Sequence, residues 1–341
     1  MSDRATLATA FLARAGWGAA TRAPLAGDAS NRRYERLAGP LGPAVLMDAD
    51  PAKGEDVRPF IAIARHLKAL GLSAPGILAE DAEHGFLLLE DLGDDLFARV
   101  LARTPGREGE FYAAATDVLL DLHRHPAPPG LAPYDAETMP PLAALAYDWY
   151  FAGAVGNLPP GGARRTLTEA MAEAIATHAT PARPVLAQRD YHAENLIWLP
   201  GRQGPARVGL LDFQDARAGH PGYDLISALE DARRDVAEDT RAMAIRRYLD
   251  GSGAEAAPFE AALSVLGAQR NLRIIGVFAR LSMLYAKPHY VDLIPRVWGH
   301  LRRDLSHPAL AGVARACAAL PEPSPAVLKQ LKDLCGTARK A

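Results

Sequence analysis

Short apolar runs separated by Gly and Pro fill the first part of the chain. Over residues 24–50 the sequence reads PLAGDASNRRYERL, the turn AGPLGP and then AVLMD, and a later segment reads GILAEDAEHGFLLLED. Runs of this kind are typical of paired strands. Between them, residues 56–70 carry apolar side chains at helical spacing, which predicts a helix. We therefore expect a small, strand-rich N-terminal lobe over residues 1–92.

Beyond this lobe the apolar spacing becomes helical. The segment REGEFYAAATDVLLDLHRHP places Phe111, Val118 and Leu122 on one helical face, and further helical segments follow to the end of the chain. Strand-like stretches interrupt this pattern between residues 184 and 213. The prediction is an α+β protein with a larger, mostly helical C-terminal lobe over residues 93–341. A chain of 341 residues is long enough for two such lobes.

Composition and charge disfavour several functions. The net charge is −2 with acids and bases mixed along the chain, so no basic face for nucleic acid is expected. Charged residues interrupt the most apolar later segments, at Asp148, Arg273 and Arg280, so none reaches the roughly 18 residues that span a membrane. Cys317 and Cys335 lack the spacing of a zinc site. We expect a cytoplasmic protein without a nucleic-acid or membrane partner, and the oligomeric state is left open.

The strongest chemical signal lies in the segment LAQRDYHAENLIWLPGRQGPARVGLLDFQDA. Asn195 follows Asp190 by five positions, and Asp212 ends an apolar strand. An antiparallel hairpin folded about Gln203 and Gly204 would set Asn195 roughly opposite Asp212. Each of the three polar residues, taken singly, is equally compatible with an ordinary turn or strand end. Their combined spacing favours a functional site.

That spacing suits phosphoryl transfer. Magnesium takes one or two protein oxygens and completes its octahedron with phosphate oxygens and water, which Asn195 and Asp212 could allow. Asp190, on the loop entering the hairpin, would then be available to receive the proton of an acceptor hydroxyl.

The motifs DYHAEN and DFQDA resemble the catalytic loop and metal-binding segment of the aminoglycoside phosphotransferase family, whose members are relatives of protein kinases. This resemblance implies a two-lobed protein-kinase-like fold. It also implies Asp190 as catalytic base, Asn195 and Asp212 as magnesium ligands, and ATP as phosphoryl donor. Relatives usually carry His where this chain has Gln188, a change that bears on the positioning of the loop.

Similarity extends well beyond the motif, through GDASNRRY, VLMDADP, GFLLLEDLGD and DFQDARAGHPGYDLISALEDARRDV, and into RNLRIIGVFARL and KPHYVDLIPRVW. Within the family this combination is most similar to the anomeric N-acetylmuramate/N-acetylglucosamine kinases of peptidoglycan recycling. The resemblance implies a small-molecule amino-sugar substrate whose anomeric hydroxyl becomes an α-1-phosphate. An arginine of the C-terminal lobe could meet the lactyl carboxylate of N-acetylmuramate, and the sequence does not choose among several.

Further residues are expected to bind the nucleotide. The GDAS turn would lie over the phosphates with the Ser30 hydroxyl in reach, although a plain hairpin turn is the competing interpretation. The strand GFLLL leads to the lobe connection, where the backbone at Glu90 and Leu92 would meet adenine. A surface strand end is the alternative there.

One expected nucleotide ligand is missing. Many kinases aim a strand lysine at the ATP phosphates, whereas this chain has Met47 at the corresponding position. We expect Arg33, or less readily Arg32, to supply the cation, held by Glu55 or Asp56. Solvated strand arginines are the competing interpretation.

Two other functions stay open. A kinase for another small alcohol, of aminoglycoside, choline or homoserine type, would use the same three residues, and the absent lysine is compatible with a non-catalytic, pseudokinase-like binding protein. About a dozen residues separate Asp212 from Asp224, too few for the activation segment with which protein kinases hold a peptide. Asp224 itself either braces the catalytic loop or caps a helix.

Overall fold

The computed structural model describes residues 4–25, 31–157 and 159–338. The chain forms two compact units, each built from two separate stretches of sequence. The first contains the described residues of 1–107 together with Ala193–Ala216, and the second contains Glu108–His192 and the described residues from 217 onward. The predicted lobes were continuous and met after residue 92, whereas the first compact unit also takes in residues 93–107 and 193–216.

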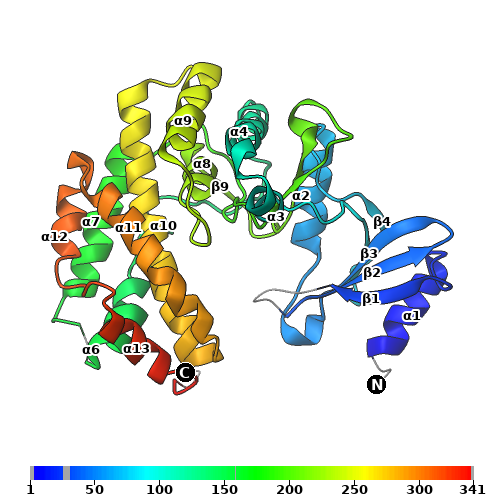
Figure 1. The fold of residues 1–341 in the computed structure, drawn as a ribbon, viewed down its shortest axis with the longest axis horizontal. Helices are drawn as coiled ribbons and strands as arrows, with labels where there is room; N and C mark the ends of the chain where they lie inside the picture. The colour runs from blue at the N-terminus through cyan, green and yellow to red at the C-terminus, as the bar shows by residue number, and fades with distance from the viewer. Residues whose placement is uncertain (1–3, 26–30, 158, 339–341) are drawn as a thin grey trace. The chain divides into compact units, whose positions relative to one another are not determined.

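The first unit is built on a five-stranded antiparallel sheet, shown in blue in Figure 1. Its strands follow the spatial order β1-β2-β3-β5-β4, so the two edge strands are β1 and β4. The strands are β1 (Thr21–Leu25), β2 (Arg33–Gly39), β3 (Gly42–Asp48), β4 (Ile77–Asp81) and β5 (Phe86–Glu90). The helices of this unit are α1 (Arg4–Arg14), α2 (Arg58–Ala69) and α3 (Phe97–Arg103).

Helix α1 packs on the sheet and closes a hydrophobic core. Phe11 stacks on Phe86 of β5 with ring centroids 5.7 Å apart, and Leu37 and Leu46 of the neighbouring strands are buried in the same cluster. An aromatic pair of this kind adds about 1 kcal/mol beyond its buried area. The core therefore ties the first helix to the three central strands of the sheet.

A short hairpin, formed by β7 (Leu196–Trp198) and β8 (Val208–Leu210), completes the first unit. The Leu210 N–H donates to the Ser73 carbonyl at 2.9 Å, and the Ser73 hydroxyl donates to the Ala206 carbonyl at 2.6 Å. At the other strand, the Trp198 N–H donates to the Asp95 carbonyl at 2.8 Å. These bonds fix the hairpin within the unit despite its distance along the chain.

The second unit is mostly helical (Figure 1). Its helices are α4 (Glu108–His123), α5 (Pro140–Ala143), a π-helix (Ala146–Phe151), α6 (Ala152–Val155), α7 (Ala163–His178), α8 (Gly222–Leu229), α9 (Glu238–Ser252), α10 (Ala256–Tyr285), α11 (Ile294–Leu305), α12 (Ala311–Ala316) and α13 (Pro325–Asp333). Its two short strands, β6 (Val185–Ala187) and β9 (Arg217–Gly219), pair antiparallel.

Short 3-10 helices occur in both units. The first unit contains those at Pro51–Lys53, Pro105–Arg107 and Gly204–Arg207, and the second contains those at Pro288–Leu293 and Pro308–Leu310.

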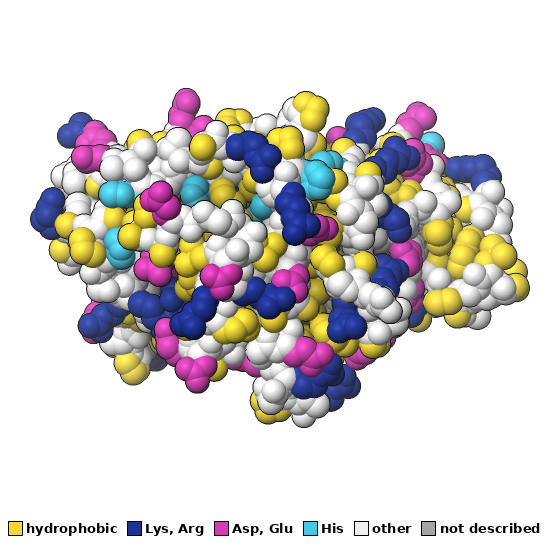
Figure 2. All heavy atoms as spheres, turned by 90° about the horizontal axis from the view of Figure 1, so that it is seen from above, with side chains coloured by type: hydrophobic (Ala, Val, Ile, Leu, Met, Phe, Trp, Pro, Cys, Tyr) yellow, Lys and Arg dark blue, Asp and Glu magenta, His cyan; other side chains and the backbone are white. Residues whose placement is uncertain are grey.

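The predicted α+β class is confirmed, with a strand-rich sheet near the N-terminus and a mostly helical remainder. The helix expected over 56–70 is α2. Among the described residues, no helix is long and apolar enough to cross a membrane. On the face shown in Figure 2, basic and acidic side chains are interspersed rather than gathered by sign.

The 30-residue helix α10 organises the second unit, because α8, α11, α5 and α7 all pack against it. One close approach needs glycine. A Cβ atom on Gly276 would lie 2.3 Å from both the carbonyl carbon and the carbonyl oxygen of Leu145, the residue that precedes the π-helix. Backbone cannot move aside as a flexible side chain could.

We expect Gly276→Ala to lower the free energy of unfolding by about 3 kcal/mol, since the added methyl group must displace backbone. Gly299, inside α11, is the matched control, because nothing lies within 4 Å of its Cβ position. Gly299→Ala should raise stability by about 0.5–1 kcal/mol through higher helix propensity. Urea denaturation of both variants measures the difference, and equal midpoints would contradict the packing argument.

Candidate active site

Two of the predicted site residues flank the β7–β8 hairpin. Asn195 precedes β7, and Asp212 comes two residues after the end of β8. The ladder pairs Leu196 with Leu210, and the Leu211 N–H donates to the Asn195 carbonyl at 3.0 Å. The predicted antiparallel hairpin is confirmed, with its centre at Gln203. Its register places Asn195 opposite Leu211, one residue short of the position that the sequence argument assumed.

The backbone changes conformation at Asp212. Its φ angle is 57°, in the left-handed region that non-glycine residues seldom adopt. In a regular strand, successive side chains point to opposite faces of the sheet. The turn at Asp212 interrupts this alternation, so its carboxylate does not have to point to the face that a continued strand would dictate. The side chain is 44% exposed, and its Oδ1 accepts a hydrogen bond from the Gln214 amide at 2.8 Å.

The residue after Asp212 anchors this turn. Phe213 is fully buried and packs against Phe60 of α2 with ring centroids 4.8 Å apart. Burying a side chain of this size contributes about 2–3 kcal/mol, which outweighs the cost of one left-handed residue. Phe213 therefore holds Asp212 in a conformation that the chain would otherwise avoid.

Arg32 lies between two carboxylates. Its guanidinium is 3.5 Å from Oδ1 of Asp212 and 3.6 Å from Oε2 of Glu55. The sheet register pairs the next-but-one residue, Tyr34, directly with Met47, the position where many kinases carry lysine. Burial raises the pKa of the Tyr34 phenol, while Arg32 acts in the opposite direction. A cation thus stands beside Asp212 although the strand lysine is absent.

Arg33 takes no part in these contacts. Its side chain is exposed, and within the described part of the chain it forms no ion pair. The sequence argument placed Arg33 ahead of Arg32, whereas the contacts with Glu55 and Asp212 are made by Arg32.

Glu90 ends β5 and is engaged through both its backbone and its side chain. Its N–H donates to the Gly76 carbonyl at 2.7 Å, and its carboxylate pairs with Arg202 of the hairpin and with Lys68 of α2.

Leu92, unlike Glu90, has no backbone hydrogen bond to another described residue. Its side chain packs near Gly209 of β8. Ser30 lies outside the described residues.

Asp190 belongs to the second unit, on the loop that follows β6. The two residues before it donate their backbone N–H groups to the carboxylate of Asp224, Gln188 at 2.6 Å and Arg189 at 2.9 Å. Arg189 is left-handed, with φ of 76°. On the other side of Asp190, the buried hydroxyl of Tyr191 donates to the Ala115 carbonyl at 2.8 Å. The loop is therefore held on both sides of Asp190.

Asp224 lies in the first turn of α8 and is 1% exposed. Of its two predicted roles, bracing of the loop is confirmed, and its side chain does not cap the helix. Burial raises its pKa to about 7; the N–H bonds from Gln188 and Arg189 lower it, and the nearby Asp190 charge raises it further.

Two tyrosines and a histidine of the second unit also belong to this region. The negative charge of Asp190 acts on Arg273 of α10, and Tyr134 and Tyr223 lie beside that arginine. The hydroxyls of the two tyrosines are 3.3 Å apart. His192 is buried, and burial lowers its pKa to about 4, so its imidazole is neutral at physiological pH. Neither tyrosine was predicted as a site residue, because nothing in the local sequence pattern links them to the loop.

The oxygen donors of the hairpin bear on metal binding. In the described ranges no three His, Cys, Asp or Glu side chains group as a metal cage. Two oxygen donors on one hairpin, Asn195 and Asp212, fit an ion that takes its remaining ligands from phosphate and water, as magnesium does. Arg32 beside Asp212 adds positive charge suited to an anionic ligand.

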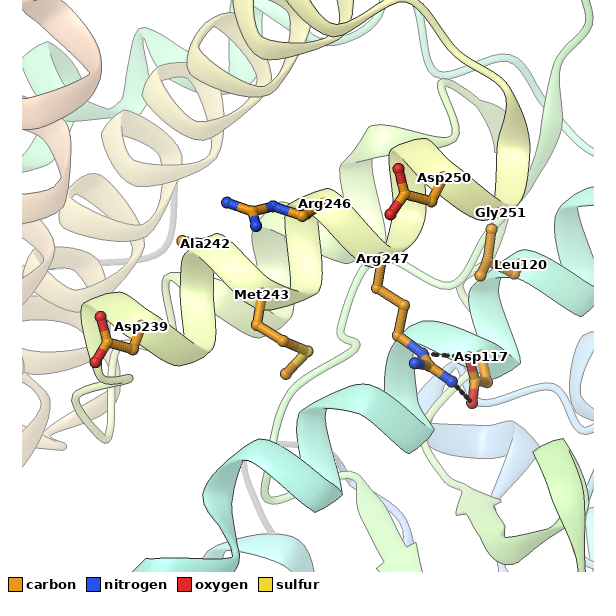
Figure 3. Close-up of a pocket in the computed structure, with 9 residues that line it drawn as sticks. All are labelled: Asp117, Leu120, Asp239, Ala242, Met243, Arg246, Arg247, Asp250 and Gly251. Atoms are coloured by element: carbon orange, nitrogen blue, oxygen red, sulfur yellow. Dashed lines mark hydrogen bonds and ion pairs between the residues drawn. The ribbon is translucent and has the colours of Figure 1, made fainter.

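A separate pocket lies between α4 and α9 (Figure 3). Within it, Arg247 of α9 forms two hydrogen bonds with Asp117 of α4, at 2.6 and 2.8 Å. It is lined by Asp117, Leu120, Asp239, Ala242, Met243, Arg246, Arg247, Asp250 and Gly251, none of which is a predicted site residue.

Comparison with known proteins identifies the family of this chain. The model of a family described as "Phosphotransferase enzyme family" matches residues 21–263. The chain is 39% identical, over 345 residues, to a Caulobacter vibrioides protein named N-acetylmuramate/N-acetylglucosamine kinase, and the match covers 91% of this chain and 94% of the relative.

Solved structures share the fold at low sequence identity. An ethanolamine kinase of Plasmodium vivax superposes with a TM-score of 0.59 at 12% identity, covering 86% of this chain and 83% of the other. A ternary complex of streptomycin, ATP and APH(2")-IIa superposes with a TM-score of 0.56 at 15% identity, covering 95% and 98%.

Asp224 gives the unfolding free energy a predictable dependence on pH. The pKa of Asp224 is raised to about 7 in the folded state. The stability that this shift contributes to the fold is therefore fully present below the ordinary pKa near 4 and is lost as pH rises through 7. Asp224→Asn should be less stable at low pH by about 1–3 kcal/mol, having lost one acceptor. Its stability should also fall less steeply than wild type between pH 5 and 8. Urea denaturation across that range tests this, and parallel pH curves would contradict it.

Proposed function

Because this chain belongs to the phosphotransferase enzyme family, we propose that it transfers the terminal phosphoryl group of ATP to the anomeric hydroxyl of N-acetylmuramate and N-acetylglucosamine. The product is the sugar α-1-phosphate, and the reaction serves cell-wall recycling in the cytoplasm. The observation that carries the proposal is the identity with the Caulobacter vibrioides relative, which runs through nearly the whole of both chains. The family match by itself supports only a phosphotransferase.

Asp190 acts as the general base. An anomeric hydroxyl is more acidic than the other hydroxyls of the ring, so the base needs to accept its proton only late in the reaction. What the protein must supply is orientation, since phosphoryl transfer needs little covalent chemistry from side chains. The bonds from Gln188 and Arg189 to Asp224 provide that orientation by fixing the backbone just before Asp190.

Asn195 and Asp212 would hold the magnesium ion of the nucleotide. The ion, when bound, neutralises charge on the phosphate oxygens. The left-handed backbone at Asp212 and the burial of Phe213 keep the carboxylate ready for this contact without rearrangement of the hairpin. Leu92 offers backbone groups to adenine after the end of β5 at Glu90, and Ser30 remains a predicted phosphate contact.

Arg32 replaces the missing strand lysine. Its guanidinium is 3.6 Å from Glu55 and 3.5 Å from Asp212. In kinases, the strand lysine is likewise a cation that forms an ion pair with a glutamate. Nucleotide phosphates would supply a stronger partner for this guanidinium than the partly exposed Asp212 carboxylate. Arg33 would then contribute little.

Arg32→Ala is expected to lower kcat/KM for ATP by about 100-fold, because a charge-assisted contact to phosphate contributes about 1.5–3 kcal/mol. Arg33→Ala, at the next residue and the start of β2, is the matched control and should change kcat/KM for ATP less than threefold. Steady-state kinetics with ATP varied measures both. If Arg33→Ala is the damaging variant, the assignment of Arg32 is wrong.

An acceptor screen with mass detection tests the function itself. Incubation with ATP and magnesium should add one phosphate to N-acetylmuramate or N-acetylglucosamine, and mild acid should release it, as expected for a 1-phosphate. Asp190→Asn should lower kcat by a factor of about 100 to 10,000. Asp250→Asn, an exposed aspartate of α9 shown in Figure 3, is the control. The proposal would be overturned if the protein phosphorylated neither sugar but another alcohol, such as choline, homoserine or an aminoglycoside.

A further inference from the structure

Arg36 of β2 binds two carboxylates that follow the end of β5. Its Nη1 donates to Oδ2 of Asp94 at 2.6 Å and its Nη2 donates to Oδ1 of Asp94 at 3.0 Å, so the guanidinium holds both oxygens of that side chain. The same Nη2 donates to Oδ1 of Asp91 at 3.1 Å, and Nε lies 2.7 Å from Oδ2 of Asp91. A single surface ion pair contributes little, whereas a guanidinium that engages two carboxylates through several contacts fixes their geometry.

The two aspartates enclose a short turn. Asp91 and Asp94 lie on either side of Leu92 and Gly93 in the sequence. Oδ1 of Asp91 also accepts the Gly93 N–H at 2.9 Å, and Gly93 has a φ angle of 87°, which glycine adopts without strain. The Asp91 side chain is only 8% exposed. The turn is therefore closed from within by Asp91 and tied to β2 by Arg36.

Leu92 has backbone groups that are available inside this turn. It is half-buried, and no backbone hydrogen bond joins it to another described residue. Its side chain packs near Gly209 of β8, which holds the residue from the side of the hairpin. Backbone N–H and C=O groups away from water normally have partners, so these two groups are suited to bind a ligand.

The sheet register places Arg36 on a particular face of the sheet. Arg36 pairs with Val45, which lies two residues before Met47 on β3. Paired residues share a face in an antiparallel sheet, and so do alternate residues along one strand. Arg36 is therefore on the face of Met47, the position of the strand lysine in many kinases. The adjacent residue Leu37 is on the opposite face, in the core that α1 covers.

We infer that Arg36 is a positioning residue of the nucleotide site, which holds the turn at Leu92 so that its backbone selects adenine over guanine. This inference rests on the proposed function. Adenine presents an acceptor at N1 and a donor at N6, whereas guanine presents a donor at N1 and an acceptor at O6. The N–H and carbonyl groups of one backbone segment can match the first pattern, and the second would leave them unpaired. Because the match depends on the place of Leu92, it depends on the clamp formed by Arg36.

The test is the ratio of kcat/KM for ATP to kcat/KM for GTP, measured with the full chain and a saturating sugar acceptor. The two nucleotides carry the same ribose and phosphates, so any effect on magnesium, on Arg32 or on folding acts on both and cancels in this ratio. Arg36→Met should lower the ratio by about 10-fold, through loss of well-placed hydrogen bonds to adenine.

Arg22→Met is the matched control. Arg22 forms a similar pair of hydrogen bonds within the same sheet, to Glu35 at 2.5 and 3.0 Å. Its side chain is 30% exposed, against 29% for Arg36, and its carboxylate partner belongs to β2 rather than to the turn. Arg22→Met should leave the ratio unchanged, and an equal fall in both variants would show a general effect of the sheet and overturn the inference.

A second variant covers the case in which Arg36→Met does not fold. Asp94 is 59% exposed, so Asp94→Asn should fold normally while it weakens the clamp, and its ratio should fall about threefold. The inference is wrong if Arg36→Met lowers activity with both nucleotides by one factor, or if it does not fold and Asp94→Asn keeps the wild-type ratio.

Wild-type protein that uses ATP and GTP equally well would also overturn the inference, and the proposed function would stand. Wild-type protein that phosphorylates neither sugar with ATP would overturn the proposed function, and this inference with it.

Discussion

The buried carboxylate of Asp224 determines the shape of the loop that carries Asp190. It accepts the N–H groups of Gln188 and Arg189, which would otherwise be donors without partners beside a fully buried helix turn. An unpaired buried donor costs about 1–3 kcal/mol, so this pair of bonds also offsets the strain of the left-handed Arg189. Asp190, the proposed general base, therefore owes its position to a buried residue of another element, helix α8.

In the first unit, apolar packing offsets the strain of a left-handed residue. Asp212 is left-handed like Arg189, and the burial of Phe213 against Phe60 supplies the compensating energy. Among the described residues, three non-glycine positions have positive φ, and the third, Ala286, ends helix α10. The two that are not helix ends are a proposed metal ligand and the neighbour of the proposed base. Apart from that helix end, the left-handed non-glycine positions of the described residues therefore lie at or next to proposed site residues, where backbone strain turns side chains away from regular structure.

Local patterns were sufficient for the α+β class, the helix α2 and the antiparallel hairpin, because each depends on the spacing of apolar residues and on turn chemistry. They could not decide between Arg32 and Arg33, since the choice depends on where β2 begins and on contacts with Glu55 and Asp212 from distant segments. The hairpin centre was misplaced because a single residue in the turn shifts the register. The role of Asp224 needed the tertiary structure for the same reason, because burial and hydrogen-bond partners separate a brace of the loop from a helix cap.

Glu90 links three parts of the first unit, since its carboxylate pairs with Arg202 of the hairpin and Lys68 of α2 while its backbone bonds to Gly76. The strand that leads to Leu92 and the hairpin that carries Asp212 are thus cross-linked into one frame. In the proposed site, adenine would lie at one end of that frame and the metal ligands at the other, so the protein would fix the distance between them. A nucleoside diphosphate would then make the same adenine contacts but end one phosphate short of the transferable group, and it would compete for the site without acting as a donor.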